Sequence, residues 1–304
     1  MRRTFLTLAL LLAGALALLW AQGGFDWLAA AARDTQRAAQ NAMAGSLRAL
    51  RAGEAGALAA LLGLAFGYGV AHAAGPGHGK LAIGGYGAAT RIRLGPIAAI
   101  ALAAGLGQAT TAVLLVHGGI ALFGWTRADL TALGEGALAQ ASLMAIGLIG
   151  FWLVWRGTRG MIRQAAPTPA LAVAGPHPGH VDGAERCGHR HGPGADEVAA
   201  LTSWRDAVLL IGAIAIRPCT GALFLLILTA RMGIPAAGIA GAYAMGLGTA
   251  LISVTVATLA VTARDGALMW SARLGTLRAF GPLLELAAGL LIALIALQAF
   301  RAGL

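Results

Sequence analysis

The sequence predicts an all-α integral membrane protein with about seven transmembrane helices. We expect two inverted three-helix repeats with proline-broken helices, preceded by an N-terminal signal-anchor helix. Of the 304 residues, 58% are hydrophobic and only 11% are charged, less than half the roughly 25% charged residues of a soluble domain. Glycine occurs 45 times, which favours close helix–helix approach in a bilayer. The apolar residues also form separate runs, each long enough for a span of about 20 residues.

The formal net charge of +10 does not indicate a nucleic-acid partner. The basic residues are spread among apolar blocks, as in the short loops of a membrane protein, and only Lys80 is a lysine. The two cysteines, Cys187 and Cys219, exclude a disulfide scaffold and a four-cysteine zinc site. We therefore expect membrane lipid and a small solute as partners, and the oligomeric state is left open.

The first element is an apolar run at residues 4–21, behind two arginines. We expect residues 1–21 to form a signal-anchor or first transmembrane helix, because the small-residue cleavage pattern of a signal peptide is weak. In residues 22–55, apolar side chains such as Met43 and Leu47 are interleaved with arginines and aspartates. This pattern predicts an amphipathic periplasmic segment outside the bilayer or along its surface.

Six further apolar runs follow, and with the first they make seven spans. They cover residues 57–90, 97–123, 137–155, 206–230, 235–262 and 281–300. The first repeat then occupies residues 56–157, a histidine-rich loop residues 158–204, and the second repeat residues 205–304. With the N-terminus in the cytoplasm, about twice as many basic residues fall on the cytoplasmic side, including the loop. We therefore predict a multi-pass membrane protein with this loop in the cytoplasm.

The repeat is predicted from two pairs of similar segments. Gly105-Leu-Gly-Gln-Ala109 resembles Gly246-Leu-Gly-Thr-Ala250, 141 residues later, and Pro76 precedes Pro218 by 142 residues. Three spans per copy would place the copies in opposite orientations, and interrupted helices in matching positions are typical of secondary transporters. Chance similarity between glycine- and alanine-rich helices is the alternative.

The first proline break lies between two histidines. The helix cannot continue through Gly75, Pro76 and Gly77, so His72 and His78 can converge across it. Imidazole suits nickel, cobalt, zinc and copper better than magnesium or calcium. These histidines are the leading candidates for a transported-metal site, although membrane histidines also serve as bonds between helices.

The second break is Arg217-Pro218-Cys219. Arg217 keeps its proton and would repel a cation, so we expect a clamp or gate there. Cys219 could bind a soft metal as a thiolate or could be a small buried residue. Glu285 is expected either at the membrane interface or as the partner of Arg217.

Other histidines are weaker candidates for metal contact. His117, on the third span, could face the pathway and bind metal. The loop contains four histidines that could collect ions or could belong to a plain linker. These loop histidines are His177, His180, His189 and His191.

The motifs at His72–Lys80, Arg217–Gly221 and Ala244–Ala250 resemble those of the nickel/cobalt efflux permeases (RcnA/NicO type). The resemblance implies an inner-membrane exporter of Ni²⁺ or Co²⁺, with His72 and His78 matching the family's motif histidines. The related uptake permeases carry an aspartate directly before their second motif histidine. This chain has Gly77 in that place, which favours the efflux branch.

The leading hypothesis is a secondary transporter that exports Ni²⁺ or Co²⁺, coupled to protons because metal and proton compete for imidazole nitrogens. The alternatives are a nickel/cobalt uptake permease and an exporter of another small solute. The metal is cargo, so no cofactor is expected. An electron relay would need two membrane cysteines, and an intramembrane metalloprotease would need a His-Glu-x-x-His motif, which is absent from the sequence. We therefore do not expect an enzyme.

Overall fold

The computed structural model describes residues 24–74, 83–87, 90, 93–165, 195–273 and 277–301. Within these ranges the chain is helical apart from short turns, and no strand occurs in them. The predicted all-α class is therefore confirmed. The expected first helix at residues 1–21 lies outside the described residues, as does most of the loop at residues 158–204.

The elements follow the predicted apolar runs closely. They are α2 (Gly24–Arg51), α3 (Ala57–Ala74), α5 (Leu94–Val113), the π-helical turn η1 (Leu114–Gly118), α6 (Gly119–Phe123), α7 (Arg127–Ala132), the π-helical turn η2 (Leu133–Ala137), α8 (Leu138–Ala165), α9 (Ala195–Ala215), α10 (Thr220–Arg231), α11 (Pro235–Arg273) and α12 (Leu277–Arg301). Residues 83–87 form a further short helical segment.

Four helices in the described part are long and apolar enough to cross a membrane. They are Leu94–Phe123, Arg127–Arg163, Pro235–Ala267 and Gly281–Arg301, and the bent pair α9–α10 would make a fifth span. Large apolar side chains such as Leu122 and Leu148 remain exposed on their flanks, as expected where lipid covers a surface. A multi-pass membrane protein is therefore supported, while the count of seven spans stays a prediction.

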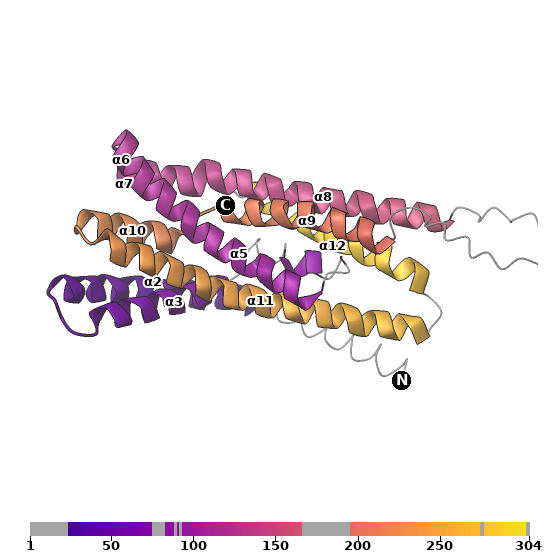
Figure 1. Cartoon of the computed structure of the whole chain (residues 1–304), viewed down its shortest axis with the longest axis horizontal. Coiled ribbons are helices and arrows are strands. Elements are labelled where there is room, and N and C mark those ends of the chain that lie inside the picture. Colours follow the sequence, from indigo (N-terminus) through magenta and orange to yellow (C-terminus); the bar gives the residue numbers. More distant parts are fainter. Residues whose placement is uncertain are drawn as a thin grey trace, which may run out of the picture.

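The helices lie side by side along the long axis of the molecule (Figure 1). α11 packs against both α3 and α5, α8 packs along α12, and α9 lies beside α5 and α8. α3 and α10 share one half of the bundle, whereas α9 and residues 83–87 share the other. The bend between α9 and α10 consequently lies inside the bundle rather than at an end.

The two similar glycine segments meet where α5 crosses α11. A β-carbon on Gly105 would come within 2.6 Å of the carbonyl oxygen of Gly246, and one on Gly246 would come within 2.8 Å of that of Gly105. The same hypothetical atoms would lie 3.1 Å from Ala250 and 3.3 Å from Ala109, respectively. Only glycine allows the two backbones to approach this closely.

The second glycine of each segment packs on a neighbouring helix. Gly248, on α11, lies against the backbone of Phe66 on α3, so a β-carbon there would overlap the Phe66 carbonyl oxygen. Gly107, on α5, lies against α9, where a β-carbon would approach Ala215 to 2.7 Å. Each glycine segment thus packs against a helix from the other part of the sequence.

The amphipathic segment predicted at residues 22–55 folds as α2, antiparallel to α3 (Figure 1). Met43 and Leu47 are fully buried and pack in one cluster with Leu61 and Ala65 of α3. The described apolar stripe is therefore covered by another helix rather than by lipid headgroups. Its opposite face is polar and exposed, for example at Arg37 and Arg48.

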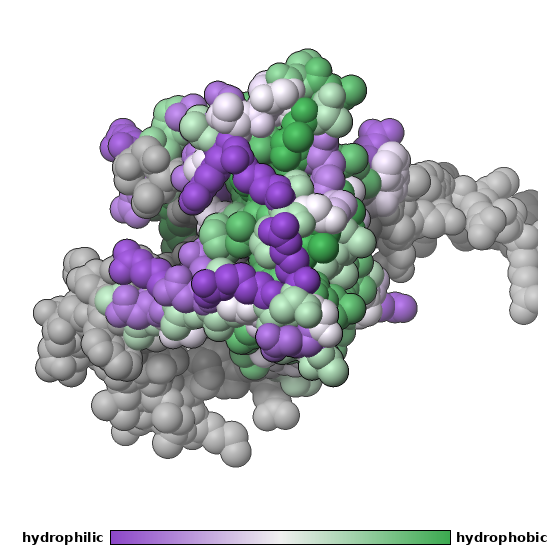
Figure 2. All heavy atoms as spheres, turned by 90° about the vertical axis from the view of Figure 1, so that its left-hand side faces the viewer, coloured by the Kyte–Doolittle hydropathy of each residue, from purple (hydrophilic) through white to green (hydrophobic). Residues whose placement is uncertain are grey.

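The two ends of the bundle are polar. At one end, exposed Arg51 and Arg231 end α2 and α10, and exposed Arg127 begins α7. Figure 2 shows hydrophilic side chains gathered on this face. At the other end, Arg264 of α11 is buried and donates hydrogen bonds to the carbonyl oxygens of Gly87 and Thr90. This contact ties α11 to the segment that follows the first break.

Candidate functional site

The second predicted break is present between α9 and α10. The two helices are bent by 57°, with residues 216–219 outside helical geometry. Proline at position 218 supplies no backbone N–H and is typical of such an interruption. The Arg217 carbonyl oxygen, which has no helical partner here, accepts a 3.2 Å hydrogen bond from Nε2 of Gln108 on α5. Gln108 on α5 therefore stabilises the break.

Cys219 is the N-cap residue of α10. Its backbone is extended, and its Sγ accepts a 3.3 Å hydrogen bond from the backbone N–H of Ala222. The sulfur thus satisfies one of the free donors at the start of the helix. Capping α10 does not require a metal. It agrees with the expectation that Cys219 is a small buried residue rather than with the expectation that it binds a metal as a thiolate.

α3 reaches the second predicted break through Tyr68. The Tyr68 ring, on α3, lies against Gly221 so closely that any side chain at 221 would overlap it. Its hydroxyl lies 3.4 Å from Oγ1 of Thr220 and accepts a 3.4 Å hydrogen bond from Nε2 of Gln40 on α2. Three elements therefore converge on one buried tyrosine.

His72 lies one helical turn after Tyr68, and the two rings are stacked with centroids 5.9 Å apart and planes 9° apart. The imidazole is half-buried near the end of α3. The remaining predicted residues of this motif, Gly75, Pro76, Gly77 and His78, lie outside the described residues. The stack places His72 next to the tyrosine that contacts Thr220 and Gly221.

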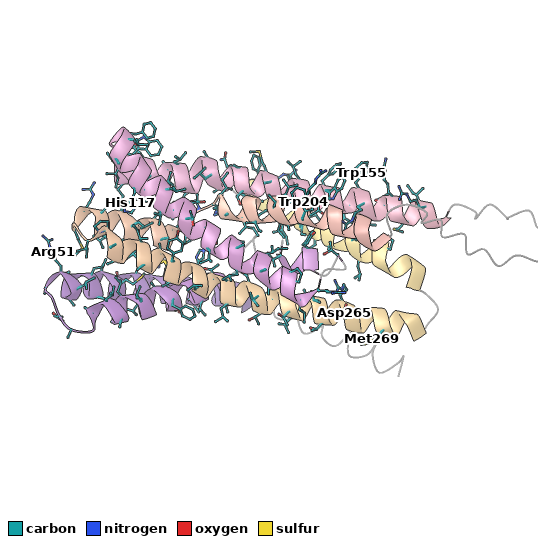
Figure 3. All side chains as sticks on the ribbon, in the orientation of Figure 1. Arg51, His117, Trp155, Trp204, Asp265 and Met269 are labelled. Carbon is teal, nitrogen blue, oxygen red and sulfur yellow. The ribbon has the colours of Figure 1, made fainter. Side chains whose placement is uncertain are left out.

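His117 lies in the π-helical turn η1 (Figure 3). Its Nδ1 is 3.1 Å from the carbonyl oxygen of Val113, which can only accept, so Nδ1 carries the proton when the ring is neutral. Nε2 then presents a lone pair, and this buried atom has no hydrogen-bond partner in the described chain. π-Helical turns occur frequently at functional sites, so the geometry leaves Nε2 free to accept a proton or bind a metal.

Arg217 is half-buried, and the charge that acts on it is the carboxylate of Glu135 in η2. The expectation that Glu285 is its partner is wrong. Glu285, on α12, accepts two 3.1 Å hydrogen bonds from Arg156 on α8. Arg156 also lies 3.6 Å from Asp206. α8 packs along α12, and this packing places Arg156 rather than Arg217 next to Glu285.

The structure brings together some predicted residues but not a metal cluster. Among the described residues, no group of three histidine, cysteine, aspartate or glutamate side chains could hold an ion. The loop histidines His177, His180, His189 and His191 lie outside those residues. Sequence reasoning missed Tyr68 and Gln40. The available signal was weak: Tyr68 precedes His72 by one turn, and Gln40 is an uncharged polar residue next to the apolar stripe of α2.

Comparison with known proteins finds a family whose model resembles part of this chain. Residues 58–186 match the model of the NicO family, described as high-affinity nickel-transport protein. The resemblance inferred from the motifs is therefore confirmed, and the segment contains His72 and His117.

A curated relative is similar to a longer part of the chain. The chain is 28% identical over 219 residues to a Haemophilus influenzae protein provisionally named as a nickel/cobalt efflux system. The aligned part covers 68% of this chain and 67% of the relative. No solved structure matches the chain. Nickel/cobalt transport by a membrane protein is thus supported, and the description of the family is one of transport rather than catalysis.

Proposed function

We propose that this NicO-type protein exports Ni²⁺ or Co²⁺ across the inner membrane in exchange for protons. The ion would pass through the centre of the bundle, where the two interrupted spans converge. The observation that carries the proposal is the contact of Tyr68 with Thr220 and Gly221, one turn from His72.

The scaffold we propose is a pair of inverted repeats. α5 and α11 run antiparallel, since Gly105 lies opposite Ala250 and Thr110 contacts Tyr243 with their hydroxyls 3.0 Å apart. Gly105 and Gly246 hold the same place in their segments and touch each other, as a two-fold axis between two copies would require. Inverted repeats with broken helices are a transporter architecture.

The apolar core supports the same relation. Ala101 and Ala104 belong to the cluster that contains Tyr86, whereas Ala242 and Met245, each 141 residues later, belong to the cluster that contains Tyr68. A two-fold axis through the α5–α11 crossing would exchange these two clusters. The broken spans would then cross the membrane in opposite directions.

The ion site would use imidazole nitrogens. We propose His72 and His78 as ligands across the Gly75–Gly77 break, with His117 as a further ligand on the path. Imidazole binds nickel and cobalt in preference to magnesium and calcium. Arg217 would act as a gate, because its fixed positive charge repels a cation unless Glu135 neutralises it. The loop histidines would capture ions on the cytoplasmic side.

Proton coupling would follow from competition for the same nitrogens. A metal binds the neutral imidazole, so protonation from the more acidic periplasmic side would release the metal there. On the cytoplasmic side, the neutral ring would bind the next ion. A pH gradient would therefore drive export without any other energy source.

Inside-out membrane vesicles test this mechanism, because export appears as uptake into the lumen. We expect wild-type vesicles to accumulate ⁶³Ni²⁺ when the lumen is acidic, and His72→Ala to lower the initial rate by more than about tenfold, as expected for loss of a metal ligand. Thr255→Val is a matched control, because this exposed hydroxyl bonds only its own helix, at Leu251. Uptake into right-side-out vesicles instead would identify a permease for import. A wild-type uptake rate in His72→Ala would contradict the proposed role of His72 as a metal ligand.

A further inference from the structure

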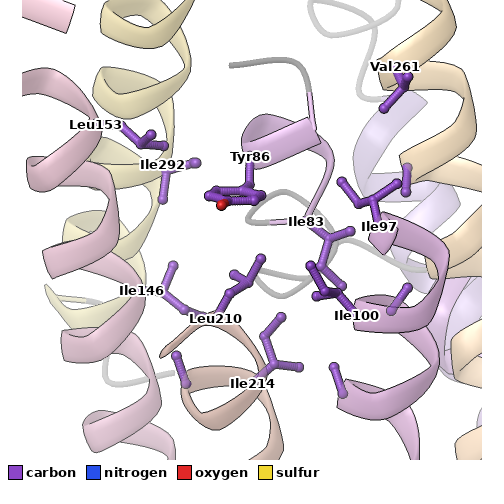
Figure 4. Packing of buried hydrophobic residues seen from close by; sticks show 14 of the residues in the cluster. Ile83, Tyr86, Ile97, Ile100, Ile146, Leu153, Leu210, Ile214, Val261 and Ile292 are labelled. Atoms are coloured by element: carbon purple, nitrogen blue, oxygen red, sulfur yellow. The ribbon is translucent and has the colours of Figure 1, made fainter. Parts of the chain in front are cut away.

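A large groove lies between α8 and α9, away from the proposed ion path. Its volume is about 840 Å³. Apolar side chains of α8 and α9 form most of its walls, and Tyr86 lies at the inner side, packed among Ile146, Leu153 and Leu210 (Figure 4). Several of its lining side chains, including Leu148 and Leu209, are more than 60% exposed, so the groove opens onto the lipid-facing flank.

The groove changes character along its length. Ala145 and Leu148 precede Trp152 on α8, and Leu209 follows Trp204 on α9, so the two tryptophans line the end of the groove farther from the bend between α9 and α10. Ala145 and Leu153 are eight residues apart on α8, which corresponds to a length of about 12 Å. Tryptophan is enriched where hydrocarbon meets headgroups. The groove therefore runs from the hydrocarbon region to the headgroup region.

Arginines mark the outer end. On α8, Leu148, Trp152, Trp155 and Arg159 follow at spacings of four, three and four residues, which places them on one helix face. The Arg159 guanidinium lies 4.2 Å from the ring centroid of Trp155, and Arg205 lies 5.4 Å from that of Trp204.

These arginines are available to an anion. Both nearby carboxylates, Asp206 and Glu285, are held by Arg156. Arg159 and Arg205 are exposed and form no ion pair within the described ranges. The outer end of the groove thus combines apolar walls with two arginines, Arg159 and Arg205, that no described carboxylate neutralises.

We propose that this groove binds an anionic phospholipid of the surrounding bilayer. One acyl chain lies between α8 and α9 against Tyr86, and the headgroup phosphate contacts Arg159 and Arg205. A zwitterionic lipid fits the trough equally well but gains less from the arginines, so charge is what the site selects. The inference requires only that the protein spans a membrane and is independent of the proposed metal export.

Native mass spectrometry of the purified protein with phosphatidylglycerol or phosphatidylcholine tests the selectivity. We expect wild type to retain phosphatidylglycerol preferentially, and Arg159→Gln/Arg205→Gln to weaken this binding by about fivefold for each arginine. Arg127→Gln/Arg231→Gln removes two exposed arginines at the opposite end of the bundle and is the matched control. Equal losses in both double variants, or no loss in the first, would overturn the proposal.

Tryptophan fluorescence gives a test that needs no arginine variant. Phosphatidylglycerol brominated on its acyl chain should quench wild-type emission more than brominated phosphatidylcholine, and Trp152→Phe/Trp204→Phe should remove the difference. Equal quenching by both lipids in wild type contradicts the site. If a second copy of the chain fills the groove instead, Ala145→Phe would convert a dimer to a monomer without changing lipid retention, and the proposal would be wrong.

Discussion

α3 and the bent pair α9–α10 are held in similar ways but carry different chemistry. The Gly69 carbonyl oxygen of the first accepts a 3.4 Å hydrogen bond from Thr249, and the Arg217 carbonyl oxygen of the second accepts a 3.2 Å bond from Gln108. Gln108 and Thr249 occupy the same place in the two glycine segments. In contrast, His72 precedes the first break, whereas a guanidinium and a helix-capping sulfur flank the second.

This comparison separates scaffold from chemistry. Small residues and a polar donor recur in α5 and α11 because each of these helices packs closely on a span from the other half of the sequence. Side chains that could bind a metal need not recur in the second half, because a transported ion needs only one binding site. The similarity between the halves therefore concerns backbone packing, and the difference between them concerns function.

The largest expected effect tests the shared packing. Gly248→Ala and Gly69→Ala would each drive a β-carbon into a backbone carbonyl across the α3–α11 contact. We expect a loss of about 1–3 kcal/mol in the free energy of unfolding, as for other overpacked sites. Thermal denaturation in detergent measures the change.

Gly67→Ala is the control for this pair, because nothing lies within 4 Å of a β-carbon at that position of α3. It should be neutral or slightly stabilising, since alanine is the better helix former. A melting temperature for Gly248→Ala equal to that of Gly67→Ala would show that the glycine contact does not hold the halves together.

A smaller effect distinguishes the two expectations for Cys219. Serine keeps a hydrogen-bond acceptor at the N-cap, so Cys219→Ser should fold like wild type, whereas Cys219→Ala should lose about 1 kcal/mol. If sulfur only caps α10, the Ser variant also keeps wild-type ⁶³Ni²⁺ flux. A stable Ser variant with strongly reduced flux would instead identify the sulfur as a metal ligand and make the two breaks chemically alike.

The smallest effect tests whether the two donors are equivalent. Gln108→Leu and Thr249→Val each remove one interhelical hydrogen bond, and such bonds contribute about 0.6 kcal/mol in membrane proteins. Similar losses of stability in both variants would support equivalent roles. A large loss in only one of them, measured by the same denaturation assay, would mean that the halves are held differently.

The sequence predicts the helical class and most span positions because apolar runs and prolines act locally. Pro218 marks a real bend, and Pro235 begins α11, the start predicted for the sixth span. The glycine segments predict a repeat, and the structure adds that Gly105 and Gly246 touch.

Other features depend on distant contacts and could not be read from the chain. The partner of Glu285 depends on how α8 and α12 are aligned, which no local pattern specifies. The π-helical turn around His117 lies in an uninterrupted apolar run, so nothing local signals its extra residue. The position of His78 relative to His72 stays a prediction.

Arg264 gives the long helix α11 a mechanical consequence. α11 is held at three places: Gly248 on α3, Gly246 on α5, and Arg264 on the carbonyl oxygens of Gly87 and Thr90. Gly248 and Arg264 are 16 residues apart on one unbroken helix, which corresponds to about 24 Å. α11 therefore acts as a rigid strut that fixes the distance between α3 and the backbone at Gly87 and Thr90.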